Sequence, residues 1–132
     1  RLQDHLTSNP TAVAQHAAIA ALTGPQECVA DMCEEYRARR MLITDGLCKI
    51  DGVRLAPPAG AFYVFPEVSA LYQKLGVQNS WDFANAILEK TNIAIVAGAA
   101  FGQESDGFVR FSYATSRAVI SEGLDRLQKL FL

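Results

Sequence analysis

The sequence has few cysteines and few histidines. Its three cysteines, Cys28, Cys33 and Cys48, form no CxxC pair, and neither His5 nor His16 has a cysteine or carboxylate at metal-ligand spacing. This pattern excludes a disulfide framework and gives no sign of a metal site. We therefore expect the cysteines to be reduced and mostly buried, as small hydrophobic residues of a cytoplasmic protein.

Long hydrophobic runs and an excess of positive charge are also missing. The longest apolar run, residues 93–101, is far too short to cross a bilayer. A formal net charge of −2 argues against a basic surface for nucleic acid. Neither end carries a secretion signal or a lipidation motif, so we expect a cytoplasmic protein with no membrane partner. Because the chain starts with Arg1 rather than methionine, we expect it to be part of a longer protein.

Apolar residues are abundant, at 50% of the 132 residues, which is enough for the core of one domain. Asn9 and Pro10 suit the N-cap and first residue of an Ala-rich helix that Gly24 ends. This helix has so little polar surface that it needs neighbours on several sides, which predicts a missing domain or a partner subunit.

Pro25 begins a second, longer helix. Apolar residues recur along it at steps of three and four, with one arginine among them, and these steps define a single stripe. The stripe consists of Val29, Met32, Cys33, Tyr36, Arg40, Ile43 and Leu47. Such a helix is typical either of a connector between two lobes or of an ordinary surface helix.

The remaining chain alternates short strands and helices. Strands are expected over residues 51–55, 60–65, 93–96 and 108–113. Ser80 and Ser116 are predicted to cap two helices. Their expected inward-facing residues are Phe83, Ala84, Ile87 and Leu88, followed by Val119, Ile120, Gly123, Leu124, Leu127 and Phe131. The short connections predict an α+β fold, in which helices cover a small, mostly antiparallel sheet and a long connector helix lies at the N-terminal side.

The strand 108–113 carries one arginine among aromatic and β-branched residues. Strand side chains alternate between two faces. The expected core face consists of Val109, Phe111 and Tyr113. Arg110 and Ser112 then lie on the other face, where a permanently charged guanidinium requires water or an anion. Two interpretations stay open: a carboxylate receptor that lines a cleft, or a solvent-facing arginine whose stem covers apolar neighbours.

Two loops rich in small residues support the cleft. They read PAGAFY, residues 58–63, and VAGAAFG, residues 96–102. Glycine allows a close approach of backbone to ligand, but neither loop has a phosphate-binding glycine pattern. The candidate cleft residues are Gly60, Phe62, Tyr63, Gly98, Phe101 and Ser112.

Five motifs, taken in chain order, resemble the C-terminal part of class I pyridoxal-phosphate aminotransferases, in the branch of the bacterial aspartate aminotransferases. They read TSNPTAVAQHAAIAAL, YRARR, PAGAFYVF, VAGAAFG and VRFSYATS. The resemblance covers essentially the whole chain. It implies the C-terminal domain of a fold type I enzyme: residues 1–24 end the large cofactor-binding domain, residues 25–50 form the interdomain connector helix, and residues 51–132 form the small domain.

The resemblance also implies residue roles. Arg110 matches the arginine that binds the α-carboxylate of the substrate. Thr7, Ser8 and Asn9 match a segment near the cofactor pocket at the dimer interface, with a plain helix cap as the alternative. Ala97 stands where the family usually has a proline, which removes rigidity from this loop.

The lysine that holds pyridoxal phosphate covalently in this family lies upstream of the Thr7 motif. The four lysines of this chain lack its sequence context: Lys49, Lys74, Lys90 and Lys129. We therefore assign no catalytic residue, and we expect the chain alone to bind no cofactor and to be inactive in transamination.

The expected partners follow from the same resemblance: an amino acid or 2-oxo acid bound through Arg110, a large N-terminal domain, and a second subunit of a homodimer. This places the longer protein in amino-acid metabolism. Two alternatives stay open. One is the effector domain of an aminotransferase-like transcriptional regulator. The other is a ligand-free structural or interaction domain, which predicts that Arg110 is solvent-exposed on a convex face.

Overall fold

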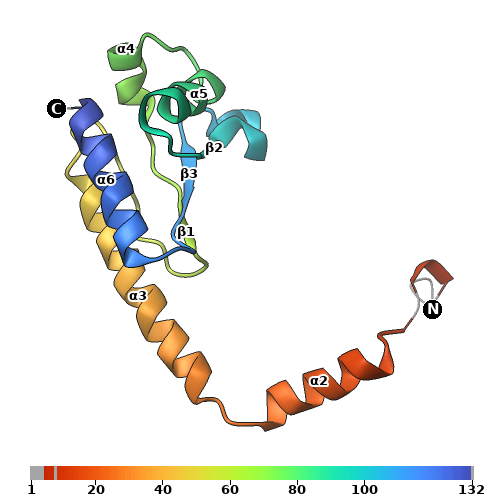
Figure 1. Cartoon of the computed structure of the whole chain (residues 1–132). Helices are drawn as coiled ribbons and strands as arrows, with labels where there is room; N and C mark the ends of the chain where they lie inside the picture. Colours follow the sequence, from red (N-terminus) through yellow and green to blue (C-terminus); the bar gives the residue numbers. More distant parts are fainter. Residues whose placement is uncertain (1–4, 8, 132) are drawn as a thin grey trace. The chain divides into compact units, whose positions relative to one another are not determined.

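The computed structural model describes residues 5–7 and 9–131. The chain falls into two compact units, divided after Cys33 within the long helix α3 (Glu27–Cys48). Figure 1 labels the helices and strands of both units. The division into domains at residues 24 and 50 stays a prediction.

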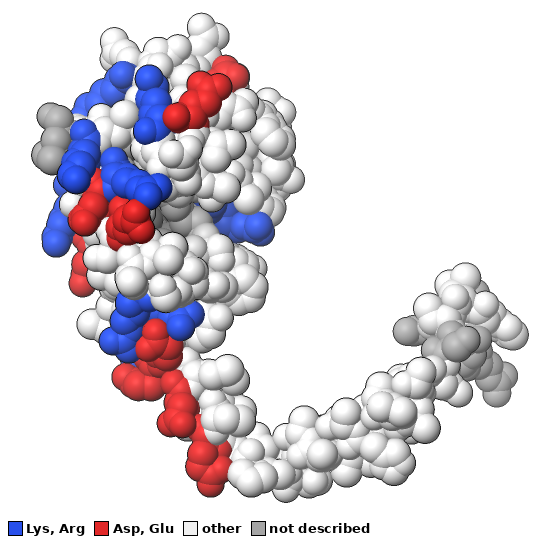
Figure 2. All heavy atoms as spheres, in the orientation of Figure 1, with Lys and Arg blue, Asp and Glu red and all other residues white. Residues whose placement is uncertain are grey.

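The first unit contains the helix α2 (Ala12–Thr23), which has no buried residue. Its N-cap is Thr11, whose hydroxyl accepts a hydrogen bond from the Ala14 N–H at 3.3 Å. The prediction of Asn9 as the cap is therefore wrong, because Thr11 has the extended backbone and the side-chain oxygen that a cap requires. Gly24 ends the helix as predicted. Figure 2 shows no charged side chain over α2.

The helix α3 begins two residues after Pro25, and its apolar stripe is only partly buried. Ile43 and Leu47 are buried in the second unit, whereas Val29 and Met32 are exposed. All three cysteines are also exposed, so the prediction of buried cysteines is wrong. Cys28 and Cys33 lie in the N-terminal half of α3, and Cys48 is its last residue.

The second unit contains a three-stranded antiparallel sheet in the order β1-β3-β2, with β1 at Tyr63–Val64, β2 at Val96–Ala97 and β3 at Val109–Ser112. Tyr63 pairs with Ser112, and Val96 pairs with Arg110. This confirms the small antiparallel sheet. The strand expected at 51–55 is reduced to a single bridge between Arg54 and Glu67, and the strand expected at 93–96 begins only at Val96.

Short helical turns lie between the strands: η1 (Ser69–Leu71), α4 (Tyr72–Leu75), η2 (Gly98–Phe101) and η3 (Gln103–Ser105). Two longer helices cover the sheet, α5 (Ser80–Thr91) and α6 (Arg117–Phe131). Asn79, rather than Ser80, caps α5, since its side chain accepts the Asp82 N–H at 2.9 Å. Ser116 caps α6 as predicted, through the Val119 N–H.

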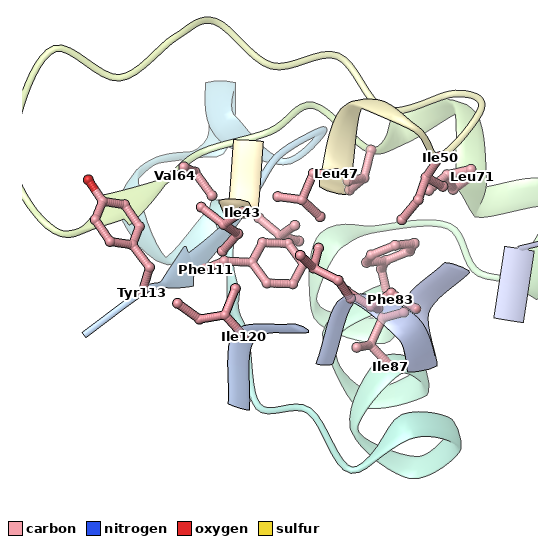
Figure 3. Packing of buried hydrophobic residues seen from close by; sticks show 14 residues of the cluster. Ile43, Leu47, Ile50, Val64, Leu71, Phe83, Ile87, Phe111, Tyr113 and Ile120 are labelled. Atoms are coloured by element: carbon pink, nitrogen blue, oxygen red, sulfur yellow. The ribbon is translucent and has the colours of Figure 1, made fainter. Parts of the chain in front are cut away.

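The core lies between β3 and the helices α3, α5 and α6 (Figure 3). Val109, Phe111 and Tyr113 are buried in it, which confirms the predicted core face of the strand. Leu88 and Val119 were expected to face inward and are exposed. The helices α3 and α6 approach closely at Gly46, where a Cβ atom would lie 2.4 Å from the side chain of Leu124.

Candidate functional site

The guanidinium of Arg110 lies on the face of β3 opposite the core. It lies between a side chain from β1, on one edge of the sheet, and a side chain that follows β2, on the other edge. Its central carbon lies 5.1 Å from the ring centroid of Tyr63 on β1. It also lies 4.9 Å from the ring centroid of Phe101, in the turn that follows β2. These are cation–π distances. Arg110 is itself half-buried, so the ligand-free alternative, which requires a solvent-exposed arginine, is not favoured.

Further aromatic rings support this pair. Phe65 meets Phe101 edge-on at 5.7 Å and stacks on Phe108 at 5.3 Å. On the other flank, Phe62 meets Tyr63 edge-on at 5.3 Å. The arginine therefore stands within a row of rings that limits the directions from which solvent and ligands reach it.

Among the described arginines, Arg110 is the one whose side chain has neither an ion pair nor a hydrogen bond to another described residue. The others have acidic or carbonyl partners: Arg37, Arg39, Arg40, Arg54, Arg117 and Arg126. Hydrogen bonds from Arg117 and then from Arg39 lower the pKa of their shared partner, Glu35. Because the N–H donors of Arg110 lack such a partner, they are available to an external anion.

The predicted cleft residues have different surroundings. Tyr63 and Phe101 contact Arg110, and Phe62 contacts Tyr63. Ser112 is exposed, and its hydroxyl accepts the Ala114 N–H at 3.3 Å. Gly60 is exposed, and no atom lies within 4 Å of the Cβ position built on it.

Gly98 does not line an open surface; it lies where two backbone segments pack against each other. It is buried, and its N–H donates to the Phe108 carbonyl at 2.8 Å. A Cβ atom at Gly98 would lie 2.0 Å from the Ser105 carbonyl oxygen and 2.4 Å from that of Phe108. The close approach of the two backbone segments therefore explains this glycine.

Enclosure of Arg110 by a cleft stays a prediction. An apolar hollow of about 240 Å³ lies between α3, α6 and the segment before β2. Its walls include Ile43, Phe111, Ser112 and Ile120, but Arg110 does not line it.

The candidate cofactor segment gives little geometry. Thr7 and Asn9 are exposed, and Ser8 lies outside the described residues.

Over residues 5–7 and 9–131, no three His, Cys, Asp or Glu side chains gather closely enough to hold a metal ion. Over the same residues, no helix combines the length and apolar character needed to cross a membrane.

Two residues outside the predicted site fix the loop 58–63. The Tyr113 hydroxyl donates to the Ala61 carbonyl at 2.9 Å, and Arg40 donates to the Pro58 carbonyl at 3.2 Å. Burial raises the pKa of Tyr113, so this hydroxyl stays protonated and donates at neutral pH. Ala61 has a φ of 63°, a left-handed conformation that is costly for a residue with a Cβ atom. The sequence held one sign of this contact: a tyrosine on the core face of a strand needs a hydrogen-bond partner for its hydroxyl.

A second group that the sequence did not reveal lies beneath the loop 98–106. Ser80 is completely buried, and it contacts Asp106 and Ala99 through hydrogen bonds. The place of Ser80 at the start of α5 predicts only a helix cap. Its actual partners lie 19 and 26 residues further along the chain, and no local pattern points to them.

Comparisons with known proteins agree on one family. The family model described as aminotransferase class I and II matches residues 1–127. The chain is 41% identical over 128 residues to the aspartate aminotransferase of Bacillus sp. (strain YM-2), covering 97% of this chain and 32% of that protein. It is also 41% identical over 132 residues to the aspartate/prephenate aminotransferase of Cereibacter sphaeroides, covering 96% and 32%.

Solved structures give the same result. The aspartate aminotransferase from Rhizobium meliloti superposes with a TM-score of 0.86 at 36% identity, covering 98% of this chain and 33% of that one. An aminotransferase from Mycobacterium tuberculosis also has a TM-score of 0.86, at 34% identity and the same coverage. The chain thus spans about a third of the length of the relatives that it matches.

Proposed function

Because this chain belongs to the class I and II aminotransferase family, we propose that it forms the C-terminal part of an amino-acid:2-oxo-acid aminotransferase. In this proposal Arg110 binds the α-carboxylate of the substrate. One observation carries the role: a half-buried guanidinium, held between two rings, has no acidic partner among the described residues. The names of the relatives support aspartate as the first substrate to test.

The surroundings of Arg110 suit carboxylate capture. The rings of Tyr63 and Phe101 lie against the guanidinium carbon and offer no acceptor for its N–H donors, which lie in the plane of the group. A carboxylate can accept two parallel hydrogen bonds from such donors. Each such charge-assisted bond contributes roughly 1.5–3 kcal/mol. Capture at this point would fix the carboxylate end of the substrate and orient its α-carbon.

The family implies pyridoxal phosphate for the longer protein, where this cofactor supplies the electron sink for transfer of the amino group. The residues of this chain do not fit a complete site for it. All four lysines are exposed: Lys49 follows α3, Lys74 lies in α4, and Lys90 and Lys129 lie in the last turns of α5 and α6.

A graft tests the role of Arg110 in a working enzyme. The matching third of the Rhizobium meliloti aspartate aminotransferase is replaced by this chain, and kcat/KM for aspartate is compared with that of Arg110 variants. Arg110→Lys cannot form the two parallel hydrogen bonds of arginine. We therefore expect kcat/KM for aspartate to fall by about 10- to 150-fold, which is equivalent to the loss of one charge-assisted hydrogen bond. Arg110→Gln should lower kcat/KM by about 10²- to 10⁴-fold, because both the positive charge and the pair of parallel donors are lost.

The matched control is Arg54→Lys, since the Arg54 side chain is 84% exposed and is distant in sequence from β3. It should leave kcat/KM unchanged. Cofactor absorbance and circular dichroism establish that each graft is folded and loaded before kinetics are compared. A folded, loaded Arg110→Lys graft that is as active as its parent graft would overturn the proposed role.

A further inference from the structure

We propose that Ser80 and Asp106 are positioning residues of the carboxylate site, because together they fix the loop that brings Phe101 against Arg110. The proposal rests on the proposed function of Arg110. It adds two residues whose hydrogen bonds run to this loop rather than to the guanidinium.

Phe101 needs such support because the core does not hold it. Its side chain is 50% exposed, and it ends the turn η2. The next residue, Gly102, has a φ of 129°, a conformation that residues with a Cβ atom rarely adopt. The second turn, η3, follows at once. A segment built from two short turns is not fixed by a long hydrogen-bond ladder, so its position depends on contacts at its ends.

Beside the backbone bond from Gly98 to Phe108, Ser80 supplies contacts near both ends of the loop. Its hydroxyl accepts the Ala99 N–H at 3.1 Å and lies 2.8 Å from Oδ1 of Asp106. Since a carboxylate only accepts, the hydroxyl must donate to Asp106. The backbone N–H of Ser80 donates to the same oxygen at 2.9 Å. One buried residue thereby joins Ala99, in the turn of Phe101, to Asp106, which follows η3.

Asp106 is anchored in turn. Its carboxylate lies at the N-terminus of α5, where the helix dipole favours negative charge. Its backbone carbonyl accepts a short hydrogen bond from the Tyr72 hydroxyl. Burial and then the charge of Asp106 raise the pKa of Tyr72 to about 12, so this donor keeps its proton at neutral pH.

A plain capping role for Ser80 does not explain these bonds. Asn79 is the cap of α5 and satisfies the Asp82 N–H. The side-chain bonds of Ser80 instead run to the loop 98–106. The geometry thus links Ser80 to the position of Phe101, and through that ring to Arg110.

The test is nuclear magnetic resonance of the Arg110 side-chain Nε–H in the 132-residue chain. Aromatic rings shift nearby proton resonances, so Phe101→Leu defines the displacement caused by losing that ring, and Arg110→Lys assigns the signal. We expect Ser80→Ala to move the signal at least half of the way toward its position in Phe101→Leu. Asp106→Ala should move it in the same direction, and the double variant should add little.

Thr91→Ala is the matched control. Thr91 is buried at the other end of α5, and its hydroxyl donates to the Ile87 carbonyl at 2.6 Å. Both Ser80→Ala and Thr91→Ala remove a buried hydroxyl and should lower Tm, but only Ser80→Ala should move the Arg110 signal. Asp106→Ala carries the test if Ser80→Ala does not fold.

If the Arg110 Nε–H signal keeps its wild-type position in folded Ser80→Ala or folded Asp106→Ala, the positioning role of these two residues is overturned. That outcome is separable from failure of the proposed function, which the Arg110→Lys graft decides without reference to Ser80. In the graft, Ser80→Ala should raise KM for aspartate more than it lowers kcat, whereas Thr91→Ala should leave KM unchanged.

Discussion

Two glycines in the loops near Arg110 should respond to the same substitution in opposite ways. Gly98→Ala places a Cβ atom 2.0 Å from the Ser105 carbonyl oxygen and 2.4 Å from that of Phe108. Contacts of this kind normally lie above 3 Å, and the obstacles are backbone atoms that cannot rotate away. Gly60→Ala meets no atom within 4 Å.

The magnitude follows from these distances. Overpacking of a core typically costs about 1–3 kcal/mol, and an overlap of about 1 Å with two backbone oxygens belongs at or above the upper end. For a unit of roughly 100 residues, each 1 kcal/mol lowers Tm by about 4–8 °C. We expect Gly98→Ala to lower Tm by about 12–24 °C. Gly60→Ala should leave Tm unchanged or raise it slightly, because alanine restricts the unfolded chain.

Thermal unfolding followed by circular dichroism measures both variants. Since Gly98 lies at the start of the turn that carries Phe101, the Arg110 Nε–H signal should also move in Gly98→Ala and stay in place in Gly60→Ala. A Tm of Gly98→Ala within about 2 °C of wild type would refute the reasoning, since 0.5 kcal/mol is too little for such an overlap.

Two further predictions concern the cofactor and pH. The chain, mixed with pyridoxal phosphate and reduced with borohydride, should retain no near-stoichiometric covalent adduct by mass spectrometry, because its four lysines are exposed and lack the sequence context of the family's cofactor-binding lysine. Full labelling of one lysine would contradict this. The raised pKa of Tyr72, about 12 in the folded state against roughly 10 in the unfolded chain, contributes stability that is complete below pH ~10 and is lost as pH rises toward 12. The urea midpoint should fall across that window, and less steeply in Tyr72→Phe than in wild type; equal slopes would count against the assignment.

The strand that carries Arg110 was predictable from sequence because its determinants are local. Side chains of a strand alternate, so the apolar residues at 109, 111 and 113 assigned the core face and left Arg110 on the other. Family membership was predictable as well, since five motifs in order carry it. Helix caps were less certain: Ser80 and its neighbour Asn79 both suit an N-cap, and tertiary contacts drew Ser80 away from that role.

The sequence by itself determined the antiparallel α+β architecture, the face on which Arg110 lies and the family to which the chain belongs. Only the tertiary structure decided that Phe101 and Tyr63 flank the guanidinium, that Gly98 is required by backbone packing while Gly60 is not, and that Ser80 fixes a loop. The physical reason is the separation along the chain over which each interaction acts. Alternation and capping propensity act over a few residues, whereas ring contacts and buried hydrogen bonds join segments distant in the chain, and only folding brings those segments together.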